Sequence, residues 1–477
     1  MRTLPAGFTA EIESYGTPWG ATLIDALTST QPSVSVRINP LKVPHAVAAA
    51  AGAGRVPWSQ FGFYLPERPV FALDPAWHQG LYYVQDSSSM AVEAAVREIT
   101  AKYLPTNRPL SMLDACAAPG GKTIAALSAL PQGSCVIANE YMADRARILV
   151  ENLSKYGSPD VVAVTSCDTA MLRVFDEAFD IVIADVPCSG EGMMRKDDQA
   201  IDQWSEKLVA DCASLQRDIV RKLWRTLRPG GFLIYSTCTF NRHENEDNIA
   251  TLALEFEAES MAVEALESIP EITHGLDPAH PSYRFLPGIC RGEGLFMAVL
   301  RKPGELPVEP WHAAGRVPGV SRTPLAPGAG KLSGIDLAKY SFASDAKGTA
   351  VWCYPTAHTD YVRAVMALRP MRAGTPVATV KGRDLAPAAE LALSTILPKQ
   401  QFPEAPLDYR AAIEYLRGNA LSDIPGDVPR GFILPSYRGF PLGFAKNIGR
   451  RANNLFPDAL RLRLQSPAEE PADIITY

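Results

Sequence analysis

Two cysteines of this chain follow short apolar runs that predict buried strands. The run 179–185 ends in Asp185, with Cys188 three residues later, and the run 232–238 ends in Cys238. A thiolate is a nucleophile, and a carboxyl group can donate or accept a proton. Parallel strands bring their carboxyl ends to one edge of a sheet, where open α/β folds bind ligands. We therefore expect the two thiols and Asp185 to open on one cleft.

A second group of candidate residues surrounds a glycine-bearing turn. The segment Asp114–Thr123 lies between a predicted strand and a predicted helix, and it matches neither G-x-x-x-x-G-K-[ST] nor G-x-G-x-x-G. The next two strands end at Glu140 and near Asp168. Either acid alone could be a helix cap or a solvated side chain. Together with Asp185 they place three acids on successive strand ends, which fits a nucleoside without a triphosphate, such as S-adenosylmethionine.

The elements that must position these residues alternate between strand and helix. This alternation predicts an α/β fold with a doubly wound, largely parallel sheet. Apolar residues recur at helical spacing from 204 to 227, and Pro229–Gly231 should end that helix. The predicted strands occupy residues 111–116, 135–140, 161–165, 179–185, 232–238 and 295–300.

Composition divides the rest of the chain. Residues 303–331 contain six Pro and five Gly, which indicates a linker. The final residues are acidic, and we expect disorder at the end of the chain. We therefore predict an N-terminal mixed α/β region at 1–90, a catalytic domain at 91–302, the linker at 303–331, a C-terminal α+β region at 332–465 and an acidic tail at 466–477.

The bulk numbers bound the class of protein. A length of 477 residues is enough for about three domains. The chain contains no apolar run near the roughly 20 residues that span a bilayer, and no signal-peptide pattern. The eight cysteines form no C-x-x-C pair and the seven histidines are scattered, so we expect reduced thiols and no metal site. We predict a cytoplasmic monomer with no membrane partner.

Three segments carry a resemblance to a known family. Ala117–Lys122, Asp185–Gly192 and Tyr235–Thr239 resemble the signature motifs of the Sun-type RNA cytosine-C5 methyltransferases. The resemblance implies a Rossmann-like class I methyltransferase sheet with an N-terminal α+β RNA-binding region. Two later segments, Phe440–Lys446 and Asn453–Pro457, resemble the RNA-binding, PUA-like end of the RsmF-like subgroup, which modifies 16S ribosomal RNA in the small ribosomal subunit.

The same resemblance implies roles for individual residues. The family assigns the nucleophile to the Thr-Cys motif, here Cys238, and product release to the Pro-Cys cysteine, here Cys188. Asp185 would bind N3 of the base. The residues that would bind S-adenosylmethionine are Cys116, Ala117, Ala118, Pro119, Gly120, Gly121, Lys122, Glu140, Asp168 and Asp185.

Formation of 5-methylcytosine explains why two thiols and an acid are needed. Carbon 5 of cytosine is a poor nucleophile until a thiolate adds to carbon 6, and it can then attack a methyl sulfonium. An acid must donate to N3, and a further group must assist elimination of the thiol. Lys122 can organise Asp185 or lower the pKa of a thiol.

The same residues distinguish this function from the alternatives. Amine methyltransferases commonly carry a Pro-Pro-aromatic motif where this chain has Pro187-Cys188. DNA cytosine-C5 methyltransferases lack the Thr-Cys partner. A transfer RNA substrate stays open, as does a catalytically silent ribosome-assembly factor that binds RNA. The presence of both cysteines, Asp185 and the glycine turn counts against the silent factor.

RNA binding by a chain of net charge -6 requires local basic patches. One basic set lies on a predicted helix, where a solvated face is the favoured interpretation: Arg217, Arg221, Lys222, Arg225 and Arg228. The better candidate lies in the C-terminal region, with aromatic residues interleaved for base stacking. It comprises Lys446, Arg450, Arg451, Arg461 and Arg463, with Tyr437, Phe440, Phe444 and Phe456.

Overall fold

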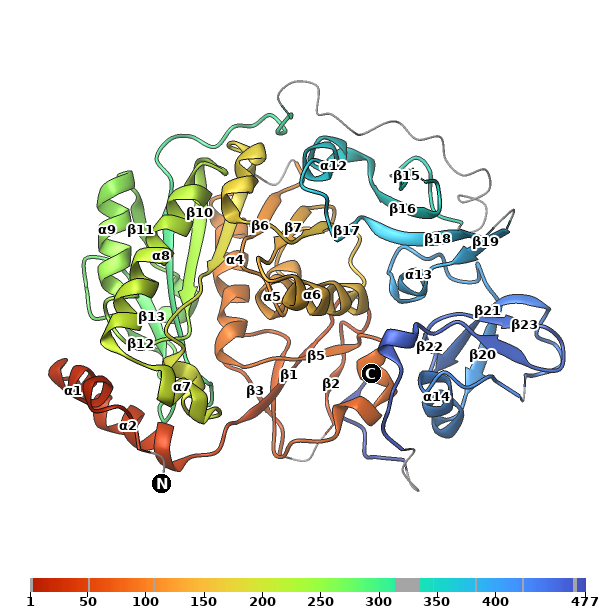
Figure 1. Ribbon diagram of the computed structural model, residues 1–477, viewed down its shortest axis with the longest axis horizontal. Helices are drawn as coiled ribbons and strands as arrows, with labels where there is room; N and C mark the ends of the chain where they lie inside the picture. The colour runs from red at the N-terminus through yellow and green to blue at the C-terminus, as the bar shows by residue number, and fades with distance from the viewer. Residues whose placement is uncertain are drawn as a thin grey trace.

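The computed structural model describes residues 3–49, 52–105, 108–313, 334–345, 347–381, 384–422, 424–465 and 470–477. Within them, the largest sheet has ten strands (Figure 1). Five neighbours run parallel in the order β10-β9-β6-β7-β8, and antiparallel strands flank them on both sides. The parallel strands are β6 (Ser111–Asp114), β7 (Cys135–Asn139), β8 (Val161–Thr165), β9 (Phe179–Asp185) and β10 (Leu227–Thr237). The flanking strands are β11 (Glu259–Met261), β12 (Thr273–His274), β13 (Ser282–Phe285), β14 (Leu295–Arg301) and β17 (Arg372–Ala373).

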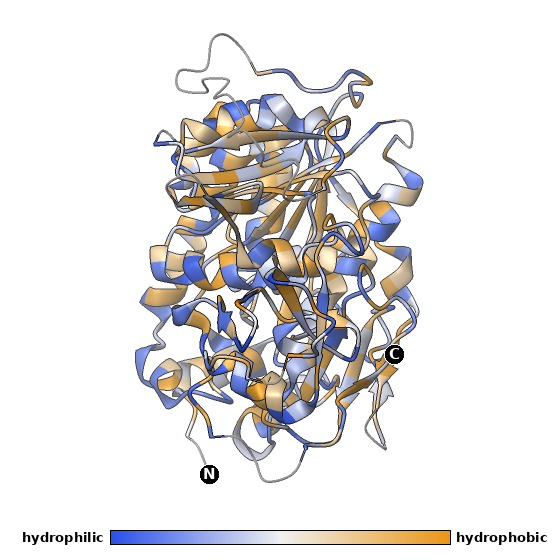
Figure 2. Cartoon of the chain, turned by 90° about the vertical axis from the view of Figure 1, so that its right-hand side faces the viewer, coloured by the Kyte–Doolittle hydropathy of each residue, from blue (hydrophilic) through white to orange (hydrophobic). Residues whose placement is uncertain are grey.

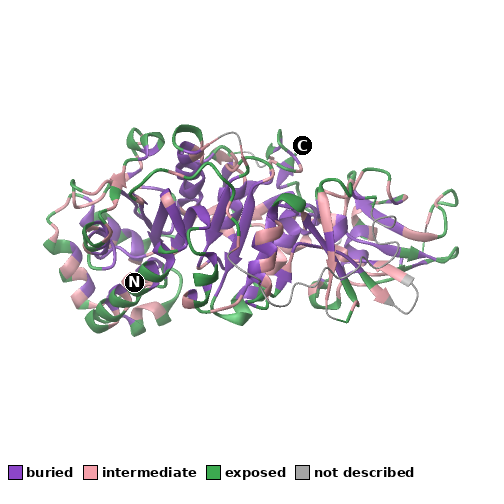
Figure 3. Ribbon diagram, turned by 90° about the horizontal axis from the view of Figure 1, so that it is seen from above, coloured by how far each residue is buried: buried purple, intermediate pink, exposed green. Residues whose placement is uncertain are grey.

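Helices cover both faces of this sheet, because its strands are apolar on both sides. One buried cluster joins the strands to α4, α5 and α6, and a second joins them to α8, α9 and α12. The buried strands between partly exposed helices are visible in Figure 3, and their hydrophobic residues in Figure 2. The predicted doubly wound, Rossmann-like fold is confirmed. The helices are α4 (Ala91–Lys102), α5 (Gly121–Leu127), α6 (Ala143–Tyr156), α7 (Asp198–Gln203), α8 (Glu206–Trp224), α9 (Glu246–Phe256), α10 (Glu264–Glu267) and α12 (Thr359–Met366).

The segment Pro229–Gly231 differs from its predicted role. Helix α8 ends at Trp224, and β10 has already begun at Leu227. Proline and two glycines resemble a helix stop, but here they form an irregularity in the pairing of β10 with β9. Gly230 has a φ of +73°, which a residue with a side chain rarely adopts. The prediction that these residues end the helix was therefore wrong.

The N-terminal region packs a small antiparallel sheet, of order β3-β4-β1-β5, against the catalytic unit. Its strand β1 carries Arg37, which is fully buried and forms an ion pair with Glu93 of α4 at 2.9 Å. This pair joins the two regions. The elements are α1 (Ala6–Ser14), α2 (Gly20–Ser29), β1 (Val34–Ile38), β2 (Val47–Ala48), β3 (Gly54–Arg55), β4 (Gly62–Leu65), α3 (Pro75–His78) and β5 (Tyr82–Val84).

The C-terminal region forms two further sheets, each with its own buried cluster. The first comprises β15 (Tyr340–Ser344), β16 (Ala350–Pro355), β18 (Thr375–Lys381) and β19 (Asp384–Pro387), with α13 (Ala389–Leu393). The second comprises β20 (Glu404–Leu407), β21 (Gly431–Tyr437), β22 (Phe440–Pro441), β23 (Ala445–Asn447) and β24 (Ala452–Asn454), with α14 (Tyr409–Leu416). Most of the predicted linker, from residue 314 onward, lies outside the described residues.

The end of the chain is ordered, contrary to the expected disorder. Strand β25 (Ile475–Thr476) pairs with β2 of the N-terminal region, and Ile474 and Ile475 are buried in that region's apolar cluster. Two isoleucines in an otherwise acidic tail are enough to seat it on an apolar surface. The last residues of the chain are thereby joined to the N-terminal region.

Candidate active site

The two cysteines meet at the carboxyl edge of the central sheet. Strands β9 and β10 are parallel neighbours, with Asp185 opposite Ser236 in the register. The loops that follow bring the sulfur atoms of Cys188 and Cys238 to 3.2 Å from each other, and both residues are half-buried. The structure therefore brings together the thiols that the sequence placed on one cleft.

Asp185 is held from two sides. Its Oδ2 lies 2.8 Å from Nζ of Lys122, and its Oδ1 accepts a hydrogen bond of 2.8 Å from Oγ of Ser236. Burial disfavours the charge on Lys122, but the Asp185 carboxylate outweighs it, so the pKa of Lys122 is raised. The sequence assigned no role to Ser236, although its place in the Tyr-Ser-Thr-Cys motif and the neighbouring strand ends could have indicated one.

The surroundings of Cys188 favour the protonated form of its thiol. The hydrogen bond with Cys238 and burial raise the pKa of Cys188 well above that of an ordinary thiol, and the nearby Glu244 adds to the effect. Cys188 is therefore protonated at neutral pH. A protonated thiol in contact with a second sulfur can supply a proton to it.

The glycine turn after β6 is fixed by contacts on each side. Gly120 has a φ of +114°, and a Cβ there would lie 3.2 Å from Leu149 of α6. The amide of Gln85 donates to the carbonyl of Gly121 at 3.0 Å, and Arg145 donates to the carbonyl of Ala118 at 2.7 Å. Gln85 is a contact that sequence reasoning missed, because it comes from the loop after β5.

One buried oxygen beside this turn has no partner among the described residues. Asp114 ends β6, and its Oδ2 accepts a hydrogen bond of 2.6 Å from Thr123, whereas its Oδ1 accepts none. Burial raises the pKa of Asp114 to about 7. A buried acceptor without a donor is costly, so this position suits a ligand that donates a hydrogen bond.

The two acids on the next strands lie along the same edge. Glu140 follows β7 and is buried, and its Oε1 accepts from the main-chain N–H of Met142 at 2.9 Å. Asp168 follows β8 and is exposed, and it accepts from the N–H of Ala170 at 2.7 Å. Both side chains thus also cap local turns. In the order β9-β6-β7-β8 they lie progressively farther from the cysteine pair.

The two basic sets differ in part, because Arg461 of the C-terminal set is also paired, with Asp458 at 2.5 Å. On α8 and just after it the side chains pair within the chain: Arg221 with Glu255 at 2.8 Å, Arg225 with Asp176 at 3.2 Å, and buried Arg228 with Asp180 at 3.6 Å. In the C-terminal region Arg450 and Arg451 are exposed, with no ion pair to the described carboxylates. This exposed pair is adjacent to β24, and we name it the C-terminal basic pair.

Three of the four aromatic residues expected beside that pair are buried. Phe444, Phe456 and Tyr437 are buried in the clusters of the C-terminal sheets, and Phe440 packs edge-on against Tyr477. The expectation of interleaved aromatic platforms was therefore wrong for Tyr437, Phe444 and Phe456, and for half-buried Phe440 it stays a prediction. Tyr437 ends β21, whereas Phe444 and Phe456 lie just outside strands, and all three fill the buried clusters of the C-terminal sheets. The basic residues nearby in the sequence give no sign of this burial.

A parallel sheet with a glycine turn after β6, and with acids at its strand ends, is the arrangement of a Rossmann-like fold that binds a nucleoside-containing cofactor, as class I methyltransferases do. Comparison with models of known protein families identifies the family to which the chain belongs. Residues 102–301 match the 16S rRNA methyltransferase RsmB/F, residues 4–87 the N-terminal domain of 16S rRNA methyltransferase RsmF, and residues 402–462 the RsmF PUA domain. The chain belongs to the RsmF family of Sun-type 16S rRNA methyltransferases, as its motifs predicted.

Individual relatives agree with this assignment. Ribosomal RNA small subunit methyltransferase F of Klebsiella pneumoniae is 31% identical over 456 residues, which cover 89% of this chain and 90% of that protein. The protein of the same name from Salmonella paratyphi A is 33% identical over 459 residues, with 89% and 90% covered. The solved NSun6 from Pyrococcus horikoshii with SFG is 20% identical, has a TM-score of 0.51 and covers 63% of this chain and 99% of that one, which supports the fold.

Among the residues described, no helix has the length and apolar character that a membrane span requires, and no three or more Cys, His, Asp or Glu side chains gather as metal ligands would.

Proposed function

We propose that this protein forms 5-methylcytosine in 16S ribosomal RNA, with S-adenosylmethionine as methyl donor, in the cytoplasm. The observation that carries the proposal is the pair of sulfurs 3.2 Å apart beside Asp185. Cytosine-C5 chemistry needs one thiol to add to the base and a second group to help it leave. The names of the relatives supply the ribosomal substrate.

The residues around the glycine turn fit S-adenosylmethionine. The unpartnered Oδ1 of Asp114 can accept from the ammonium group of its methionine part, and the buried carboxylate of Glu140 can accept from ribose hydroxyls. Asp168, being exposed at the next strand end, would meet the adenine amino group. The turn Cys116–Lys122 would line the cofactor. When bound, the cofactor supplies an electrophilic methyl group on a sulfonium.

The two cysteines have different tasks in this reaction. The thiolate sulfur of Cys238 forms a bond to carbon 6 of the cytosine, and Asp185, which binds N3, passes a proton to it as negative charge develops there. That proton returns to Asp185 when the ring becomes aromatic again. Carbon 5 would then bond to the methyl group that the bound cofactor supplies, as the bond between that methyl group and the cofactor's sulfur breaks. A base must next remove the proton from carbon 5, and the bond between carbon 6 and Cys238 breaks with its electron pair returning to sulfur. Cys188, protonated and in contact with that sulfur, supplies a proton to it.

A catalytically silent RNA-binding assembly factor would have no need of this geometry. The proposal is tested by bisulfite sequencing of ribosomal and transfer RNA from a strain that lacks the gene, with complementation by the wild-type chain. Loss of one or more 5-methylcytosines confined to 16S RNA is the expected result. Loss confined to transfer RNA would show that transfer RNA is the substrate. An unchanged pattern in both RNAs would reject the methyltransferase activity.

A further inference from the structure

A buried carboxylate in the loop of Cys188 holds the loop of Cys238. We define the Cys188 loop as residues 186–194 and the Cys238 loop as residues 238–245. Glu191 of the first loop has no solvent exposure. Its Oε2 accepts from Oγ1 of Thr239 at 2.6 Å, from the N–H of Phe240 at 2.6 Å and from the N–H of Asn241 at 2.9 Å. Its Oε1 accepts from the side chains of Asn241 at 2.9 Å and Trp204 at 3.0 Å.

A second carboxylate reaches in the opposite direction. Glu244 belongs to the Cys238 loop, and its Oε2 accepts from the N–H of Ser189 at 3.0 Å in the Cys188 loop. The same oxygen accepts from Gln216 of α8 at 2.6 Å, whose amide also donates to the carbonyl of Pro187 at 2.9 Å. Each cysteine loop therefore contributes one glutamate that binds main-chain N–H groups of the other.

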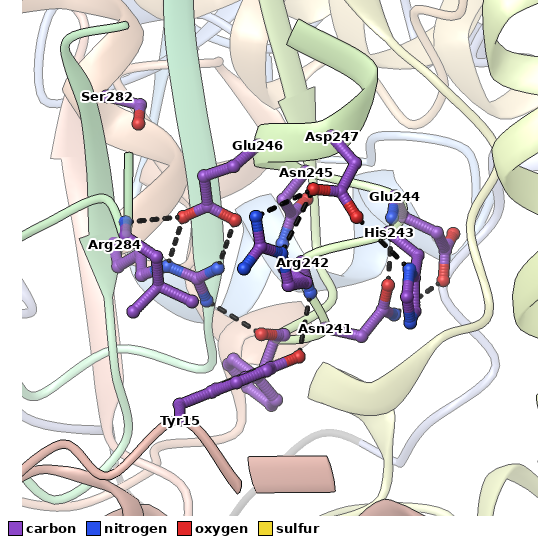
Figure 4. Close-up of polar contacts among 12 residues, drawn as sticks. Tyr15, Asn241, Arg242, His243, Glu244, Asn245, Glu246, Asp247, Ser282 and Arg284 are labelled. Atoms are coloured by element: carbon purple, nitrogen blue, oxygen red, sulfur yellow. Dashed lines mark hydrogen bonds and ion pairs between the residues drawn. The ribbon is translucent and has the colours of Figure 1, made fainter. Parts of the chain in front are cut away.

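A direct main-chain contact completes the connection. The N–H of Gly192 donates to the carbonyl of Cys238 itself at 2.7 Å, and a Cβ on Gly192 would lie 2.6 Å from that oxygen. From outside, the N–H of Arg242 donates to the hydroxyl of Tyr15 on the N-terminal segment at 2.9 Å, as Figure 4 shows. The side chain of Asn241, the residue before Arg242, donates to Glu191.

We propose that Glu191 and Glu244 are positioning residues that set the separation of the two active-site sulfurs. Charge-assisted hydrogen bonds are short and directional, and every group in hydrogen-bond contact with Glu191 is a donor. A neutral amide in its place would point an NH₂ group at other donors and leave one of them unpaired. The loops would then move relative to each other. This inference rests on the roles proposed above for Cys238 and Cys188.

The sulfur separation is measured directly with a fluorogenic reagent that carries two thiol-reactive arms. In the wild-type chain, without RNA or cofactor, it should join Cys188 to Cys238. Glu191→Gln and Glu244→Gln should lower the ratio of bridged to singly alkylated product about tenfold, and kcat for RNA methylation about 100-fold with an unchanged KM for RNA, because a 1 Å misplacement costs that much. Thr239→Val removes one donor to Glu191, and should give about a threefold fall in the bridging ratio, roughly the loss of one hydrogen bond.

The matched control is Glu98→Gln. Glu98 likewise accepts two main-chain N–H groups, those of Glu264 and Ala265 at 3.1 and 3.0 Å, but it lies on α4 away from the cysteines. Its bridging ratio should equal that of the wild type. Ratios within twofold of wild type in both the Glu191 and Glu244 variants, or an equal fall in the control, would overturn the proposal. Bridging needs neither RNA nor cofactor. The bridging ratio therefore tests the positioning role separately from the proposed RNA methylation.

Discussion

Charged residues at the carboxyl edge of the central sheet and in the C-terminal region are used in contrasting ways. At the edge, Lys122 and Asp185 are paired with each other, and Glu191 is fully buried among donors. In the C-terminal basic pair, Arg450 and Arg451 are exposed and meet no described carboxylate. Paired, buried charges fix a geometry, whereas exposed and unpaired ones can neutralise phosphates. Arg221 of α8 and Arg225 just after it are exposed but paired within the chain, so they belong to neither kind.

The contrast predicts that single substitutions at the edge abolish chemistry. Cys238→Ala should lower methyl transfer to 16S RNA by roughly 10⁴-fold or more, because no nucleophile is left to activate the base. Cofactor affinity should be unchanged, as measured by calorimetry. Cys212→Ala on α8 is the matched control and should methylate normally. Retained activity in Cys238→Ala would show that another residue is the nucleophile.

A smaller loss is expected when only the acid is altered. Asp185→Asn keeps the shape but removes the carboxyl group that holds N3, so kcat should fall by roughly 10²–10³-fold, the range of general acid catalysis. Ser236→Ala removes one hydrogen bond from Asp185 and should cost about fivefold. Single-turnover methylation measures both. Equal losses in the two variants would contradict the assignment of the acid.

In the C-terminal region the expected change is in binding and leaves the chemistry intact. Arg450→Ala together with Arg451→Ala should weaken RNA binding about tenfold at low salt and reduce the slope of log affinity against log salt by about 1.5. At saturating RNA, kcat should be unchanged. The double change of Arg221 and Arg225 to Ala, which are paired within the chain, is the control. A salt slope that falls equally in the control would break the comparison.

The smallest effect concerns stability at the edge. Burial raises the pKa of Asp114 to about 7, so the folded chain binds this proton more tightly than the unfolded chain does. The associated stability is present below pH ~4 and is lost as the pH rises toward 7. Asp114→Asn does not titrate, so its melting temperature relative to wild type should rise by a few degrees between pH 5 and pH 8. A difference independent of pH would show that Asp114 is not buried as an acid.

The sequence was sufficient to predict the parallel strands and the meeting of Cys188 with Cys238. Uninterrupted apolar runs determine those strands, and neighbouring parallel strands must open on the same edge. The sequence was insufficient where the same local pattern can form either of two structures. Pro229–Gly231 resembles a helix stop but lies within a strand, and Ile474 and Ile475 find an apolar partner more than 400 residues away in the sequence.

Within the site, the side chains that act through others were the hardest to predict. Glu191 and Glu244 have no signature of spacing, because their partners are main-chain N–H groups whose positions only the fold determines. The prediction that aromatic residues of the C-terminal region stack on bases failed for a related reason. Phe444 is buried in a cluster to which both C-terminal sheets contribute, and the local sequence does not show that packing.

The division of labour between the two sulfurs is tested most directly by Cys188→Ala. The chain is incubated with cofactor and 16S RNA, denatured, digested and analysed by mass spectrometry. If Cys188 supplies the proton that releases Cys238, a covalent RNA adduct should accumulate and map to Cys238. Normal turnover without an adduct in both Cys188→Ala and Cys188→Ser, or an adduct on another cysteine, would contradict the account.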